Sequence, residues 1–106
     1  MQDITATELN ELLQSGTDVQ LIDVRQPQEY NFAKIPGSKL IPLGEVLNRI
    51  DEIEPTRDTV FICKMGSRSA QAMMALERAG FKGKMRNLRG GITAWSNEVD
   101  PKVPKY

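Results

Sequence analysis

Short apolar segments alternate with amphipathic segments along the chain, and this order constrains the fold most strongly. The segments 19–24 and 59–62 are apolar and partly β-branched, which is typical of buried strands. Between such segments, apolar residues recur every three or four positions, as they do on the buried face of a helix. The alternation predicts an α/β domain with a mainly parallel central sheet and helices on both faces.

Local signals indicate where these elements begin and end. Thr5 and Glu8 have the spacing of a capping box, and Pro27 suits the first turn of a short helix. Gly80 is a natural helix end. Helices are expected from Thr5 to Gly16, over 27–31, 43–53 and 67–79, and after Gly90-Gly91; weaker strands are expected at 39–41 and 85–88.

The length and charge of the chain limit the classes of function. With 106 residues it has the length of one domain, expected over residues 1–97 with an extended tail at 98–106. Fourteen basic and fourteen acidic residues give zero net charge, which argues against a nucleic-acid or membrane-surface binder. No apolar run approaches the roughly 18 residues of a membrane span, and residues 1–15 do not resemble a signal peptide.

The chain has no His and one Cys. A zinc site needs three or four Cys, His or carboxylate ligands that usually include these residues, so no metal is expected. Mechanisms that pair Ser or Cys with His are excluded within the chain. A single thiol fits a reducing compartment, and we expect the cytoplasm.

That single cysteine, Cys63, follows the strand predicted at 59–62 and precedes a loop with Gly66 and a helix start near Ser67. Loop amides, the helix dipole and the cations Lys64 and Arg68 would all favour the thiolate, which is the nucleophilic form. The plainer interpretation is a buried core cysteine, since free Cys is often buried. A core residue, however, does not need a glycine, two cations and a helix start within five positions.

The segment from Cys63 to Ser69 resembles the active loop of rhodanese-like sulfurtransferases. The segments 21–25, 35–38 and 87–95 resemble other motifs of that family, in the same order, so the likeness covers roughly residues 3–97. The resemblance implies a rhodanese-like α/β fold without a cofactor. It also implies that Cys63 takes a sulfane sulfur as a persulfide and passes it to a thiol, cyanide or a sulfur-carrier acceptor.

The tail segment 100–106 resembles the end of the rhodanese domain fused behind an E1-like adenylyltransferase. This implies a role in supplying sulfur to a ubiquitin-like carrier, in molybdopterin synthesis or tRNA thiolation. The expected partners are a sulfane-sulfur donor, which is thiosulfate or a cysteine-desulfurase persulfide, a carrier protein and an amino-terminal E1-like domain. Lys34 departs from the family, which commonly has His there.

Residues 64–68 are expected to surround the persulfide. Lys64 and Arg68 would attract anionic donors, loop amides would bind the sulfur, and Met65 would face solvent or a partner. The persulfide-binding set is therefore Lys64, Met65, Gly66, Ser67 and Arg68.

Three charged residues are expected to be structural neighbours of the site. Asp23 and Arg25 end a strand, and we expect Arg25 to pair with Glu29. Trp95 is expected in the core, while Gly90-Gly91 would supply unusual backbone angles or close approach.

Two other functions remain open from the residues. A cysteine phosphatase would need five residues between Cys and Arg to encircle phosphate, whereas four residues separate Cys63 from Arg68 here. A non-catalytic interaction module could keep the fold for docking alone.

Overall fold

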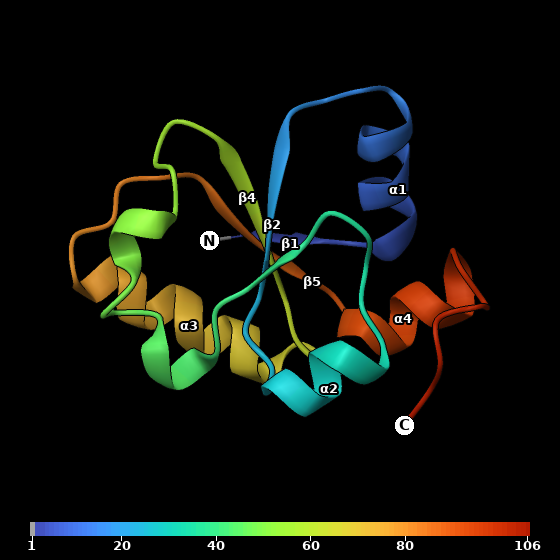
Figure 1. The fold of residues 1–106 in the computed structure, drawn as a ribbon. Helices are drawn as coiled ribbons and strands as arrows, with labels where there is room; N and C mark the ends of the chain where they lie inside the picture. Colours follow the sequence, from blue (N-terminus) through green and yellow to red (C-terminus); the bar gives the residue numbers. More distant parts are fainter. Residues whose placement is uncertain (1) are drawn as a thin grey trace.

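The computed structural model describes residues 2–106, which form five parallel strands in the order β1-β5-β4-β2-β3 (Figure 1). β4 lies at the centre and pairs with β2 on one side and β5 on the other. The strands are β1 (Gln2–Ile4), β2 (Val19–Asp23), β3 (Lys39–Leu40), β4 (Asp58–Ile62) and β5 (Met85–Leu88). This confirms the predicted parallel α/β fold.

Helices cover both faces of the sheet, with α1 and α4 on one side and α3 on the other (Figure 1). The helices are α1 (Ala6–Gln14), α2 (Pro27–Phe32), α3 (Ser67–Arg78) and α4 (Gly91–Glu98). Successive strand residues point to opposite faces. In β4, Val60 and Ile62 therefore pack in the core under α1 and α4, whereas Phe61 packs in the core under α3.

The predicted capping box at the start of α1 is present: the Glu8 N–H donates to Thr5 Oγ1 at 3.1 Å, and the Thr5 N–H donates to the Glu8 carboxylate at 2.9 Å. A turn also forms at 35–38, where the Ser38 N–H donates to the Ile35 carbonyl at 3.1 Å. These local signals set element ends correctly because each is satisfied by neighbours in sequence.

The helix predicted over residues 43–53 is wrong. The segment forms two short 3-10 helices, η1 (Leu43–Glu45) and η2 (Ile50–Glu52), joined by turns. Gly44 and the β-branched Val46 lower helix propensity, and the turns still bury Val46 and Ile53 in the core. The sequence also gave no signal for β1, whose three residues are defined by pairing with β5.

The segment after α4 folds back onto the domain. The Val103 side chain is buried in the core under α1 and α4, and Ser96 Oγ donates to the Val103 carbonyl at 2.7 Å. Tyr106 then reaches α2. No helix within residues 2–106 is long and apolar enough to span a membrane.

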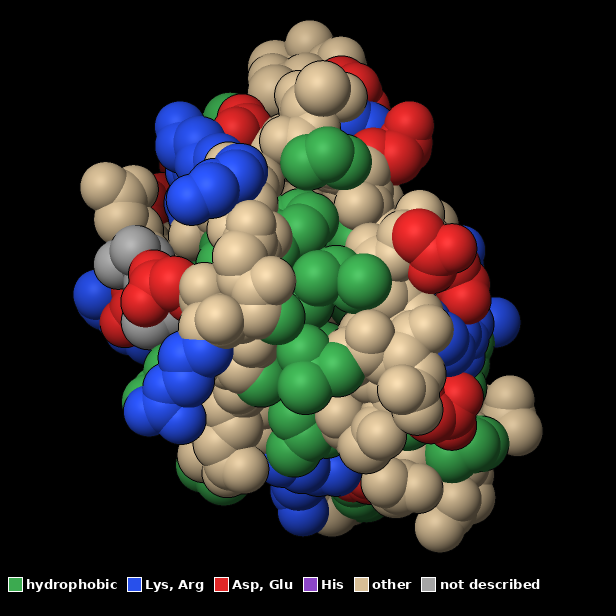
Figure 2. Space-filling view, turned by 90° about the vertical axis from the view of Figure 1, so that its left-hand side faces the viewer, with side chains coloured by type: hydrophobic (Ala, Val, Ile, Leu, Met, Phe, Trp, Pro, Cys, Tyr) green, Lys and Arg blue, Asp and Glu red, His purple; other side chains and the backbone are tan. Residues whose placement is uncertain are grey.

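On the side of the molecule seen in Figure 2, hydrophobic side chains form a band down the middle of the surface. Charged side chains lie mainly toward the edges of that view (Figure 2).

Candidate functional site

Cys63 lies directly after β4, at the carboxyl end of the central strand. A three-residue bend, residues 64–66, then leads to α3, whose first residue is Ser67. Ligands of open parallel sheets bind at this edge, so the position agrees with a functional role. Cys63 is only 1% exposed and packs with the core under α3.

Two groups contact the sulfur. The Gly66 N–H donates to Cys63 Sγ at 2.9 Å, and Ser69 Oγ lies 3.3 Å from it. Gly66 caps α3 with a φ of 112°, a left-handed conformation that favours glycine and turns its amide toward the sulfur. The positive end of the α3 dipole adds to this, so both features place positive electrostatic potential at the sulfur.

Ser69 and Asn87 were not predicted as site residues. Ser69 is fully buried, and its hydroxyl contacts the Asn87 side-chain oxygen as well as the Gly66 carbonyl. The Asn87 amide donates to the same Gly66 carbonyl at 3.0 Å, which fixes the glycine. The sequence did contain a signal for Asn87, because it is a polar residue near the carboxyl end of the strand predicted at 85–88, where ligands of parallel sheets bind. In the structure this strand is β5, and Asn87 pairs with Phe61 of β4.

The start of α4 holds the outer side of the loop. The Ile92 N–H donates to the Cys63 carbonyl at 2.9 Å, and the Thr93 N–H donates to the Lys64 carbonyl at 3.2 Å. Gly91 has a φ of 57°, and a Cβ there would lie 2.5 Å from the Lys64 carbonyl carbon. The expectation that Gly90-Gly91 supplies unusual angles and close approach is confirmed, and the surface it approaches is the cysteine loop itself.

Arg68 is committed to an ion pair. Its guanidinium donates to both carboxylate oxygens of Glu29, at 2.6 and 2.9 Å, and so links the first turn of α3 to α2. The expectation that Arg68 offers its charge to donors therefore needs correction, because Glu29 already neutralises it. The pair instead anchors the start of α3, directly after the loop, to α2.

The predicted pairing of Arg25 with the Glu29 carboxylate is wrong. Arg25 pairs with Asp23 instead, at 2.7 Å, and both side chains are fully buried. The Glu29 carboxylate is taken by Arg68, and Arg25 reaches only the Glu29 carbonyl, at 3.3 Å. Arg25 Nη1 also donates to the Tyr106 hydroxyl at 2.8 Å. Asp23 and Arg25 thus connect β2, α2 and the tail.

The other loop side chains face outward. Met65 is 66% exposed, Ser67 is exposed, and Lys64 is half-buried with its ammonium 4.6 Å from the centre of the Tyr106 ring. Within residues 2–106, no three Cys, Asp or Glu side chains are grouped closely enough to hold a metal ion.

The Glu29–Arg68 pair predicts an acid-dependent loss of stability. Hydrogen bonds from Arg68 lower the Glu29 pKa from 4.5 to about 2. A lowered folded-state pKa stabilises the protein above pH 4.5, and this contribution is lost as the pH falls toward 2. Urea unfolding should show wild type more stable than Glu29→Gln at pH 7, with the gap narrowing between pH 4.5 and 2. A gap independent of pH would contradict the pairing.

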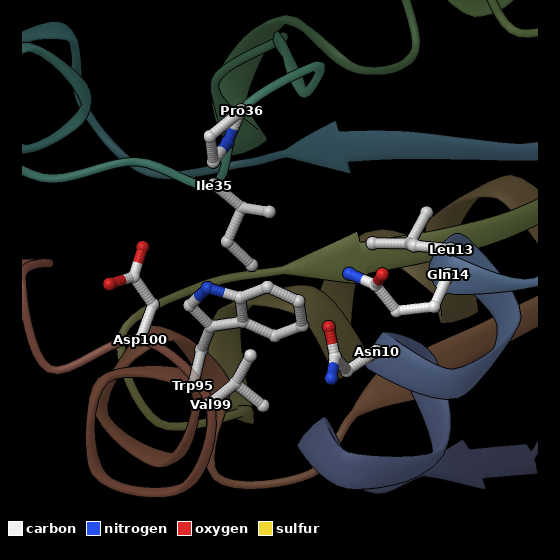
Figure 3. A pocket seen from close by; sticks show the side chains of 8 residues that line it. All are labelled: Asn10, Leu13, Gln14, Ile35, Pro36, Trp95, Val99 and Asp100. Carbon is white, nitrogen blue, oxygen red and sulfur yellow. The ribbon is translucent and has the colours of Figure 1, made fainter.

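A hollow of about 400 Å³ lies away from the cysteine loop, between α1, α4 and the turn at Ile35-Pro36 (Figure 3). The Trp95 indole lies across it, between Ile35 and Val99, with α1 side chains on the other side (Figure 3). Trp95 is 5% exposed, as expected of a core residue. None of residues 63–68 lines this hollow.

Comparison with known proteins decides the family. The family described as "Rhodanese-like domain" matches residues 5–98. The chain belongs to the rhodanese-like domain family. Among solved rhodanese structures, a rhodanese-like domain protein from Staphylococcus aureus superposes with a TM-score of 0.84 and 30% identity, covering 100% of this chain and 99% of that one.

Rhodanese-like relatives of this chain occur both alone and inside longer proteins. "Sulfurtransferase" of Allochromatium vinosum is 37% identical, covering 97% of this chain and 95% of its own length. "Probable adenylyltransferase/sulfurtransferase MoeZ" of Mycobacterium tuberculosis is 40% identical over 97% of this chain. "Rhodanese-like/PpiC domain-containing protein 12, chloroplastic" of Arabidopsis thaliana is 38% identical over the whole chain. The chain spans only 26% and 38% of these last two proteins.

Proposed function

We propose that this rhodanese-like domain is a sulfurtransferase whose Cys63 carries the sulfur. The observation that supports this most directly is the Gly66 N–H placed 2.9 Å from Cys63 Sγ, at the start of α3. A backbone donor and a helix start aimed at one sulfur stabilise a thiolate, which is the form that attacks. The sulfurtransferase names of full-length relatives support the same activity.

The reaction balances without a cofactor. The Cys63 thiolate attacks the outer sulfur of thiosulfate, a new S–S bond forms, and sulfite leaves with the electron pair of the broken S–S bond. In the second step an acceptor thiolate or cyanide attacks the outer sulfur of the persulfide and restores the Cys63 thiolate. The two steps give ping-pong kinetics. The Gly66 amide and the Ser69 hydroxyl are placed to accommodate the negative charge on sulfur in both.

We further propose that the acceptor is a ubiquitin-like sulfur-carrier protein, in molybdopterin or thiolated-tRNA synthesis, and that the domain works beside an E1-like domain in the cytoplasm. The likeness to MoeZ supports this, as does 33% identity over 92% of this chain to the "Putative sulfur carrier protein YrkF" of Bacillus subtilis. The exposed Met65 beside the cysteine is the loop residue best placed to contact such a carrier.

Two incubations of the wild-type protein separate this function from its rivals. With thiosulfate, the intact mass should increase by one sulfur atom, located on Cys63, and cyanide should remove it. With an aryl phosphate there should be no turnover, because four residues between Cys63 and Arg68 make a small anion pocket and Arg68 is held by Glu29.

The rival functions make opposite predictions for the same samples. Aryl phosphate turnover that Cys63→Ser abolishes would indicate a phosphatase. A protein that gains no sulfur from thiosulfate or from a desulfurase persulfide would be a docking module.

A further inference from the structure

Tyr106 brings the tail to the rim of the cysteine loop. Its hydroxyl accepts from Arg25 Nη1 at 2.8 Å and donates to Glu29 Oε2 at 3.0 Å. Its ring meets Phe32 edge-on, with the ring centres 6.0 Å apart. The orientation of the ring is therefore fixed by α2 and by Arg25, two residues after β2, although Tyr106 itself is 40% exposed.

The face of this ring holds the ammonium group of Lys64. Lys64 Nζ lies 4.6 Å from the ring centre, within the range of a cation–π contact. The backbone of Lys64 is fixed separately, since its carbonyl accepts from the Thr93 N–H. Both ends of this long side chain are thus constrained, which is unusual for a lysine.

Lys64 differs from the other cations near the sulfur in having no carboxylate partner. Arg25 is paired with Asp23 and Arg68 with Glu29, whereas no ion pair of Lys64 is found within residues 2–106. Aromatic contact leaves the positive charge intact, while a carboxylate cancels it. Lys64 directly follows Cys63 in the chain, so its uncancelled charge is the one that the loop offers to an anionic sulfur donor.

We propose that Tyr106 is a specificity-determining positioning residue, which holds the Lys64 ammonium beside Cys63 so that anionic sulfur donors are preferred to neutral ones. This inference rests on the proposed function, because it concerns access to the same sulfur. It assigns the tail a role in donor choice. The ring supplies the contact to Lys64, and the hydroxyl aligns the ring between Arg25 and Glu29.

Alkylation of Cys63 tests the inference without any sulfur transfer. Iodoacetate and iodoacetamide are similar in size, but only iodoacetate is negatively charged. The ratio of their rates, normalised to free cysteine, should fall about three- to fivefold in Lys64→Ala, which is the effect of one unit charge a few ångströms away at high dielectric. Tyr106→Leu should lower the ratio equally, whereas Tyr106→Phe, which keeps the ring but loses the hydroxyl bonds that align it, should lower the ratio less than Tyr106→Leu does. High salt should reduce the wild-type preference.

Two controls show whether the effect depends on a charge near Cys63 and whether Lys64 and Tyr106 act through the same ammonium group. Lys82→Ala removes the same charge from the exposed loop before β5, at the opposite end of the sheet, and should leave the ratio unchanged. In Lys64→Ala/Tyr106→Leu the ratio should fall no further than in either single variant, because both act through one ammonium group. Additive losses would overturn the proposal, as would a wild-type ratio in Tyr106→Leu.

Steady-state kinetics give the second measurement. Tyr106→Leu should raise the thiosulfate KM several-fold with kcat little changed, since it weakens donor attraction and leaves the sulfur chemistry intact. A fall in kcat with unchanged KM would overturn the proposal and point to a general structural role.

The alkylation result also distinguishes failure of the Tyr106 role from failure of the proposed sulfurtransferase activity. If the alkylation ratio falls as expected in Lys64→Ala and Tyr106→Leu but the wild-type protein transfers no sulfur, the proposed function alone would be overturned. Failure of both reagents to modify Cys63 would overturn both, because the sulfur would then be unreachable.

Discussion

Replacing Cys63 with Ser should abolish thiosulfate-dependent sulfur transfer while the domain stays folded. Serine is close to cysteine in size, and its Oγ can still accept from the Gly66 N–H, so the loop keeps its main contact. The hydroxyl is far less nucleophilic than a thiolate and cannot form a persulfide. Loss of a covalent nucleophile costs orders of magnitude, so we expect residual activity below about 1%.

The measurement is thiocyanate production from thiosulfate and cyanide, with circular dichroism and urea unfolding to confirm the fold. Residual activity well above 1% in a folded Cys63→Ser protein would contradict covalent catalysis by this residue. A variant that unfolds would instead assign Cys63 to the core, and trapping of the wild-type persulfide would then decide between the two roles.

Replacing Gly91 with Ala should damage both stability and activity. The new Cβ would overlap the carbonyl groups of Cys63 and Lys64, and a φ of 57° is itself strained for alanine. The backbone atoms it meets cannot turn away as a flexible side chain would. We expect a loss of unfolding free energy of roughly 2–4 kcal/mol, the range for overpacking plus backbone strain, and at least a tenfold loss of kcat/KM as the loop shifts.

Gly16→Ala is the matched control, since Gly16 has a φ of 76° and nothing lies within 4 Å of its added Cβ. It should show the cost of backbone strain alone, about 1 kcal/mol, with normal sulfur transfer. Equal effects of Gly91→Ala and Gly16→Ala on activity would show that α4 does not control the loop.

The sequence predicted the parts of the fold that depend on neighbouring residues. The Thr5 cap, the strand at 59–62 and the helix after Gly66 follow from local hydrogen bonding, β-branching and apolar periodicity. β1 was missed because its position is set by pairing Gln2 with Arg86, which no local pattern reveals. The segment 43–53 was misassigned because tertiary packing replaced the periodic helix with two 3-10 helices.

In the candidate site, too, the features set by neighbouring residues could be predicted and those set by long-range contacts could not. Cys63, Gly66 and the four-residue spacing to Arg68 stand together in the sequence and could be identified there. The choice of partners could not, because Glu29 had two arginines within reach and only packing decides that Arg68 takes it while Asp23 takes Arg25. Tyr106 was not connected to Lys64, because no spacing rule links a tail to a loop more than 40 positions earlier.

The α4 hydrogen bonds to the cysteine loop have a consequence for how the domain is made. Synthesis delivers Cys63 well before Ile92 and Thr93, whose N–H groups fix its loop, and β1 waits much longer still for its partner β5. Long-range pairings of this kind form late and slow the folding of a chain. The nascent thiol therefore emerges from the ribosome without its loop in place, and the geometry around the sulfur depends on completion of α4.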